Sequence, residues 1–195
     1  FISQGLKDAK SDDIIIISDL DEIPNLAGIN FNNIKNEVII FRHEMFYYKF
    51  NLKLPNYKWT GSKACKMKNL KSPQWLRNIK DKKFAFYRLD TFFSDTKYRN
   101  LSIIENGGWH YTNIKTAEEI LNKLKSYLHH QEFDENPLSL EQIENIIQSK
   151  TAIYNLGVDQ RQNKFGAGPK LTKIEKNEMP EYLKINSDIF SKWLD

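Results

Sequence analysis

Four consecutive isoleucines, Ile14 to Ile17, constrain the fold of this chain more than any other feature of its sequence. β-Branched residues without alternation are typical of a strand covered on both faces, as in the parallel or mixed sheet of an α/β protein. The strand should end within Ser18 to Pro24 (Ser-Asp-Leu-Asp-Glu-Ile-Pro), because proline cannot continue a ladder of backbone hydrogen bonds. The sequence therefore predicts a central strand over residues 14–18, with neighbours on both sides and carboxylates at its carboxyl end.

Other patterns predict the remaining elements. Apolar runs indicate a second buried strand over 38–41, a half-exposed strand over 83–88 and a short strand over 101–104. Capping boxes open two helices, at Thr116 and Ser139. The first, over 117–130, should pack on the sheet through its apolar stripe of Ile120, Leu121, Leu124 and Leu128. At 195 residues and 23.0 kDa, residues 1–195 are expected to form one α/β domain, a mixed sheet flanked by helices.

Positive charge is concentrated in one part of the chain. Residues 49–83 hold ten lysines and Arg77 against a single acid, Asp81, whereas the whole chain has a net charge of only +4. Together with the aromatic residues of this segment, the charge suggests an anionic partner. An anionic surface or an acidic glycan is the expectation, and nucleic acid is not; the alternative is a solvated lysine face.

The spacing Asp19-x-Asp21 carries the clearest chemical signal. In an extended backbone, residues two apart point the same way, about 6.6 Å apart. Two such carboxylates can share a hard divalent cation, and ligands of open α/β sheets bind beyond the carboxyl ends of strands. We therefore expect Asp19 and Asp21 to bind Mn²⁺ or Mg²⁺, although a solvated turn would explain the same residues.

Four segments, in order, resemble glycosyltransferase family 17, the family of the bisecting β-1,4-mannosyl-glycoprotein N-acetylglucosaminyltransferase. They are residues 12–24 with the two aspartates, Gly107-Gly108-Trp109-His110, the helix with Lys123, Ser126, His130 and Glu132, and Pro180-Glu181-Tyr182-Leu183 followed by Asn186 and Phe190. The resemblance implies a GT-A-like fold and an enzyme. That enzyme would use a divalent metal to transfer a sugar, with inversion, from a UDP-sugar such as UDP-N-acetylglucosamine to a glycan hydroxyl.

The resemblance also suggests roles for single residues. His110 would complete the metal shell, and Gly108, Trp109 and Lys123 would contact the donor. An inverting transfer needs a general base, for which Glu22, beside the metal pair, is the first choice. The rival carboxylates are Glu44, Asp90, Glu105 and Glu132. Each residue also has a structural explanation. Glu22 would brace the loop, His110 would be a buried histidine, Trp109 a core tryptophan and Lys123 a surface lysine.

Two other functions fit parts of the sequence. A phosphatase of the haloacid-dehalogenase type also has a strand ending in Asp-x-Asp, but it normally carries Thr or Ser where this chain has Ile23, and its later Gly-Asp motif is not found. A glycan- or anion-binding module with a degenerate site would use the aromatics and lysines instead.

The start of the chain departs from the GT-A pattern. Only 18 residues precede Asp19, whereas GT-A domains usually place their uridine-binding strand–helix units before this strand. We therefore expect the C-terminal portion of a longer GT-A domain; the alternative is a protein that resembles the family but no longer binds the nucleotide. No signal peptide and no apolar run of about 18 residues is visible, which favours the cytoplasm, although a missing N-terminal part could carry an anchor.

Overall fold

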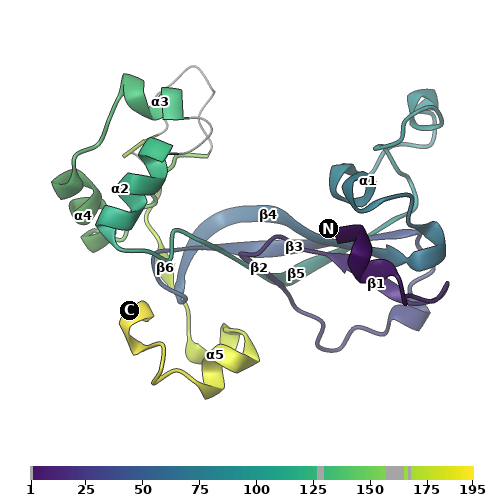
Figure 1. Ribbon diagram of the computed structural model, residues 1–195, viewed down its shortest axis with the longest axis horizontal. Helices are drawn as coiled ribbons and strands as arrows, with labels where there is room; N and C mark the ends of the chain where they lie inside the picture. Colours follow the sequence, from purple (N-terminus) through teal and green to yellow (C-terminus); the bar gives the residue numbers. More distant parts are fainter. Residues whose placement is uncertain (1, 127–129, 157–164, 167) are drawn as a thin grey trace. The chain divides into compact units, whose positions relative to one another are not determined.

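The computed structural model describes residues 2–126, 130–156, 165–166 and 168–195, and it shows an α/β protein with a six-stranded sheet (Figure 1). The strands are β1 (Ile14–Ile17), β2 (Glu22–Pro24), β3 (Val38–Tyr47), β4 (Leu52–Lys66), β5 (Leu101–Thr112) and β6 (Thr172–Lys173). The α-helices are α1 (Pro73–Asn78), α2 (Ala117–Ser126), α3 (His130–Glu135), α4 (Leu140–Gln148) and α5 (Glu181–Ile185). Short 3₁₀ turns lie at Ile2–Leu6, Phe31–Asn33, Met67–Asn69, Leu89–Thr91, Lys176–Glu178 and Ser191–Trp193.

The strand order in the sheet is β1-β4-β3-β5-β2, and β6 also pairs with β4. The prediction that residues 14–18 form a central strand is wrong, because β1 pairs antiparallel with β4 and ends the order on that side. The four isoleucines are accordingly half-buried rather than fully buried. Strand β2 ends the order on the other side, which is where a proline such as Pro24 is tolerated.

The chain divides into two compact units, each with its own core. The first unit consists of Phe1–Glu44 and Lys58–His110, and the second of Met45–Tyr57 and Tyr111–Asp195. Strands β3, β4 and β5 therefore contribute residues to both.

Apolar clusters cover both faces of the sheet in the first unit. One includes Val38 and Ile40 with Trp75 and Leu76 of α1, and Ile17 packs against it. The other is built around Ile39, Phe41 and Ala64, with Ile14 and Ile16 packed against it. The isoleucine strand thus contacts an apolar cluster on each face, but the predicted burial on both faces is only partial.

Residues 83–88 do not form the predicted strand. This stretch has no regular structure apart from a turn, and Phe86 and Tyr87 are 84% and 69% exposed. Phe86 and Tyr87, whose alternation predicted a strand, are therefore not packed against an apolar face of the described structure.

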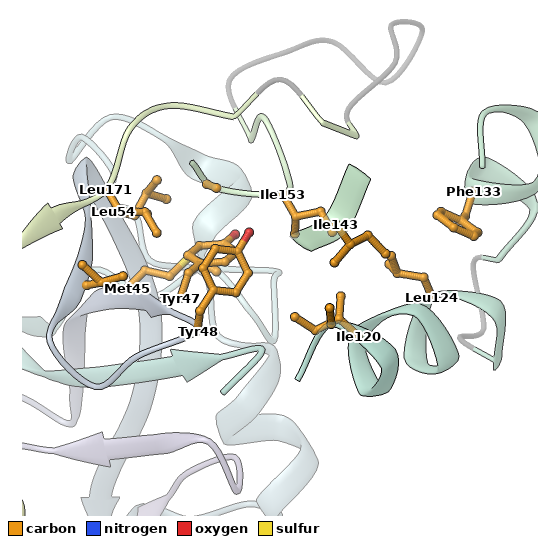
Figure 2. Packing of buried hydrophobic residues seen from close by; sticks show 13 residues of the cluster. Met45, Tyr47, Tyr48, Leu54, Ile120, Leu124, Phe133, Ile143, Ile153 and Leu171 are labelled. Atoms are coloured by element: carbon orange, nitrogen blue, oxygen red, sulfur yellow. The ribbon is translucent and has the colours of Figure 1, made fainter. Parts of the chain in front are cut away.

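The core of the second unit joins α2 and α4 to strands β3 and β4 (Figure 2). Ile120 and Leu124 of α2 are buried against it, as is Ile143 of α4. Leu121 packs against the same cluster. The predicted packing face of this helix is confirmed; Leu128 lies outside the described residues. No helix among the described residues is long and apolar enough to cross a membrane.

Candidate functional site

Two of the segments singled out in the sequence pair directly with each other in the first unit. Strands β2 and β5 are antiparallel, with Glu22 opposite His110, Ile23 opposite Trp109 and Pro24 opposite Gly108. The backbone N–H of Asn25 extends this pairing by donating to the Gly107 carbonyl at 2.8 Å. Segments nearly ninety residues apart in the sequence therefore form one local structure.

Gly108 is required by this pairing. Its φ is +151°, and a Cβ built on it would lie 2.2 Å from the carbonyl oxygen of Ile23. Any larger residue would therefore push β2 away from β5. This close approach explains the glycine structurally, beside the donor contact that the resemblance implies.

The two aspartates lie in a turn, not in the extended backbone that the sequence predicted. Strand β1 ends at Ile17, and the N–H of Glu22 donates to the carbonyl oxygen of Asp19 at 3.1 Å. The side chain of Glu22 closes the turn further, since its Oε2 accepts from the N–H of Asp19 at 3.1 Å. Leu20 is fully exposed at the tip. The argument that Asp19 and Asp21 point the same way along a strand therefore does not hold.

Asp21 lies close to His110, as predicted. Asp21 Oδ1 is 3.8 Å from His110 Nδ1, and His110 is buried, with 7% of its surface exposed. The His110 ring stacks on Trp59 at a centroid distance of 4.7 Å and an angle of 17°. Trp59 thus fixes the plane of the imidazole beside the carboxylate.

The Asp21 carboxylate and the His110 imidazole are close enough together to bind the same divalent cation. Metal–oxygen and metal–nitrogen bonds of about 2.0–2.2 Å allow two ligand atoms 3.8 Å apart to share one ion. Within the described residues, no group of three or more His, Cys, Asp or Glu side chains is arranged to hold a metal. Mg²⁺ is usually bound by one or two carboxylates together with substrate phosphates, and Asp21 is a carboxylate of this kind.

Asp19 contacts a cation of the protein. Nη2 of Arg77, in α1, is 2.9 Å from Asp19 Oδ1 and 3.1 Å from Oδ2. Both residues line a cavity of about 190 Å³. Its other lining residues are Ile17, Ser18, Glu22, Trp59, Thr60, Gly61 and Lys63.

Glu22 is well placed but already engaged. Its Oε1 accepts from Trp59 Nε1 at 2.7 Å, while its Oε2 accepts from the backbone of Asp19. Glu22 is buried and lines the cavity. These bonds give Glu22 the bracing role considered above, and each oxygen keeps a second lone pair for a ligand.

The rival carboxylates are also paired. Glu44 contacts Lys58, Glu105 contacts Arg42, and Asp90 accepts from Arg88 and Lys97. The side chains of His130 and Glu132 lie outside the described residues.

Trp109 and Lys123 belong to the described strand β5 and helix α2. Successive residues of a strand point to opposite faces, so Trp109 and its neighbour His110 lie on opposite sides of β5. Lys123 belongs to the second unit, where its Nζ donates to Asn113 Oδ1 at 2.8 Å. Their expected donor contacts remain predictions.

His43, in the centre of the sheet, was missed by the sequence analysis. It is completely buried, and neither ring nitrogen has a hydrogen-bond partner among the described residues. A Cβ on Gly61 would lie 2.3 Å from its ring, and one on Gly108 would lie 2.9 Å away. Burial and the neighbouring His110 lower the pKa of His43 to about 4.

Trp59 and Arg77 were missed as well. Both belong to the basic, aromatic segment 49–83, which was the only signal that could have found them. Acids outside that segment contact several of its other cations, with Glu44 beside Lys58, Asp12 beside Lys66 and Lys68, and Asp95 beside Lys71. These pairs favour a structural explanation for part of its charge.

Comparisons of the chain with protein-family models, with curated proteins and with solved structures give no match. The function is therefore indicated by the residues of the site and by the resemblance of the four short segments.

Proposed function

We propose that this protein is a metal-dependent inverting glycosyltransferase. It would move a sugar, with N-acetylglucosamine as the first candidate, from a UDP-sugar to a glycan hydroxyl. The observation that carries the proposal is the β2–β5 register, which pairs the Asp-x-Asp segment with the Gly-Gly-Trp-His segment. These are two of the four segments that resemble family 17, and their pairing places Asp21 beside His110.

Asp21 and His110 are the residues that would hold Mn²⁺ or Mg²⁺. A bound cation of this kind stabilises negative charge on a departing diphosphate. His110 must be neutral to act as a ligand, and its stacking on Trp59 keeps the ring in place. Asp19 would add a second carboxylate; it lines the cavity described above, whereas Asp21 and His110 are not among the residues that line it.

Glu22 is the base that we propose for the acceptor hydroxyl. It is the one carboxylate, besides Asp19, among the described residues that line the cavity. The hydrogen bond from Trp59 fixes Oε1, so the carboxylate is oriented before an acceptor arrives.

A glycan- or anion-binding module is the second candidate. Large apolar side chains are exposed along a short stretch of the first unit, where the guanidinium group of Arg99 lies 4.3 Å from the centre of the Phe92 ring; they are those of Phe86, Tyr87, Leu89, Phe92 and Phe93. Exposed aromatic rings next to cations suit a carbohydrate face or an anionic polymer. Such a module would need no metal.

Binding of UDP separates these candidates. We expect UDP to raise the melting temperature and to bind in calorimetry only when Mn²⁺ is present. Asp21→Asn should abolish this binding and leave the melting temperature of the free protein nearly unchanged, because the Asp21 side chain is half-exposed. Asp12→Asn, at an exposed carboxylate of the same unit, is the matched control and should bind normally.

Two other results would change this assignment. Metal-dependent UDP binding that survives in Asp21→Asn would remove the metal role of this residue. Stabilisation by a glycan or a polyanion without metal, and none by UDP, would favour the binding module. His110→Ala is a poorer test, because His110 is buried against Trp59 and its loss would also affect folding.

A further inference from the structure

The ion pair between Arg77 and Asp19 lies at the border of the cavity and is open to solvent. The Arg77 side chain is 46% exposed and the Asp19 side chain 43%. Exposed ion pairs contribute little to stability, because water and salt screen them. This contact is therefore weak enough to be exchanged for another.

The backbone of Arg77, in contrast, is firmly held. Trp75 and Leu76, just before it in α1, are buried in the core of the first unit. The buried ammonium group of Lys63 donates to the carbonyl oxygens of Arg77 and Ile79, the latter at 2.5 Å. These bonds satisfy carbonyls at the end of the helix. The guanidinium group can therefore change partner without any change in the helix.

The charge of the cavity requires a cation at this place. Asp19 and Glu22 both line it, so a diphosphate entering without a counter-charge would meet two carboxylates. Guanidinium groups bind phosphate oxygens through a planar fork of N–H donors. Lys63 is less suited, because its ammonium group already caps α1.

We infer that Arg77 is an exchangeable counter-ion of the donor site. In the free protein it neutralises Asp19; when a divalent cation reaches Asp19, the guanidinium group moves to the diphosphate of the nucleotide. The inference rests on the proposed function and adds a donor-binding residue that the sequence did not indicate. A purely structural ion pair would instead hold the turn at Asp19 and have no effect on either ligand.

Calorimetry with Mn²⁺ alone, and with UDP in saturating Mn²⁺, tests the inference. Arg77→Gln should bind Mn²⁺ alone several-fold more tightly, because a competing cation is gone. The same variant should bind UDP at least tenfold more weakly, because a phosphate ligand is gone. Arg77→Lys keeps the charge and should lie between wild type and Arg77→Gln in both measurements.

Arg88→Gln is the matched control. Arg88 forms a similar ion pair with Asp90 in the same unit but does not line the cavity, so neither affinity should change. Two affinities that stay constant in Arg77→Gln, or that shift in the same direction, would overturn the inference. Failure of the proposed function is a different result: wild type itself would then bind no UDP with Mn²⁺, and an unchanged Mn²⁺ affinity in Arg77→Gln would still refute the exchange at Asp19.

Discussion

Gly61 and Gly108 make room for an imidazole in the middle of the sheet. The His43 ring is so close to both that a Cβ on either would collide with it. A buried polar group without a hydrogen bond lowers the free energy of unfolding by about 1–3 kcal/mol. The protein tolerates this loss at His43, which lies beside His110. The ring must stay neutral there, since a charged imidazole in this place would have no counter-ion among the described residues it touches.

The stability of the protein should therefore depend on pH through His43. Its pKa is about 4 in the folded protein and near 6.5 in the unfolded chain. Between these values the unfolded chain binds the additional proton, so the free energy of unfolding decreases as the pH falls from 6.5 to 4. The decrease should approach about 3 kcal/mol. Urea unfolding of wild type and His43→Gln at several pH values measures it.

The comparison with His43→Gln isolates this one group. Carboxylates protonate in the same range, but they do so in both proteins, and glutamine keeps a polar side chain of similar size. The loss of stability at low pH should thus be smaller in the variant. Parallel curves for the two proteins would show that His43 titrates normally and is not excluded from protonation.

Among the elements, α2 offers the clearest test of packing. Leu124 is 2% exposed and contacts the core shared with α4 and the strands of the second unit. Leu124→Ala should lower the free energy of unfolding by about 2–5 kcal/mol, since it leaves a cavity. Asn122→Ala, on the exposed side of the same helix, should change it by less than about 0.5 kcal/mol. A loss well below 1 kcal/mol at Leu124 would mean that the buried face is wrongly assigned.

The helices defined by local patterns were predictable from the sequence, whereas the alternating pattern of residues 83–88 did not form a strand and the order of the strands in the sheet was not predictable. The Thr116 box and the stripe through Ile120 and Leu124 depend on neighbours within four residues, and all are present. The edge position of β1 depends on its pairing with Lys63 to Lys66, about fifty residues away. No local pattern around Ile14 to Ile17 contains that information.

The same difference between local and long-range information explains which residues of the candidate site could be identified from the sequence. Asp21 and His110 were recognisable because each belongs to a characteristic short segment. Trp59 and Arg77 reach the site only through β4 and α1, so neither has a local signature. The turn at Asp19 was only the alternative to an extended strand, because its closing bonds come from Glu22, whose side chain folds back on the backbone.

At the scale of the whole molecule, the residues that hold the metal, the base and the counter-ion in our proposals belong to one compact unit. Asp19, Asp21, Glu22, Arg77 and His110 all lie in the first unit, whereas α2, α4 and Lys123 lie in the second. Each unit has its own apolar core. Binding should therefore stabilise the two units unequally.

Hydrogen exchange with and without Mn²⁺ and UDP should reveal this difference. At a ligand concentration of 100 times Kd, binding stabilises the native state by about 2.7 kcal/mol, which slows exchange up to about 100-fold for amides whose opening destroys the site. We expect this protection at residues 18–24 and 105–110, where β2 pairs with β5, and no change in α2 or α4. Asp21→Asn with the same ligands should show no protection anywhere. Protection centred on α2 would instead assign the diphosphate to Lys123, and the first unit would no longer be sufficient for binding the donor.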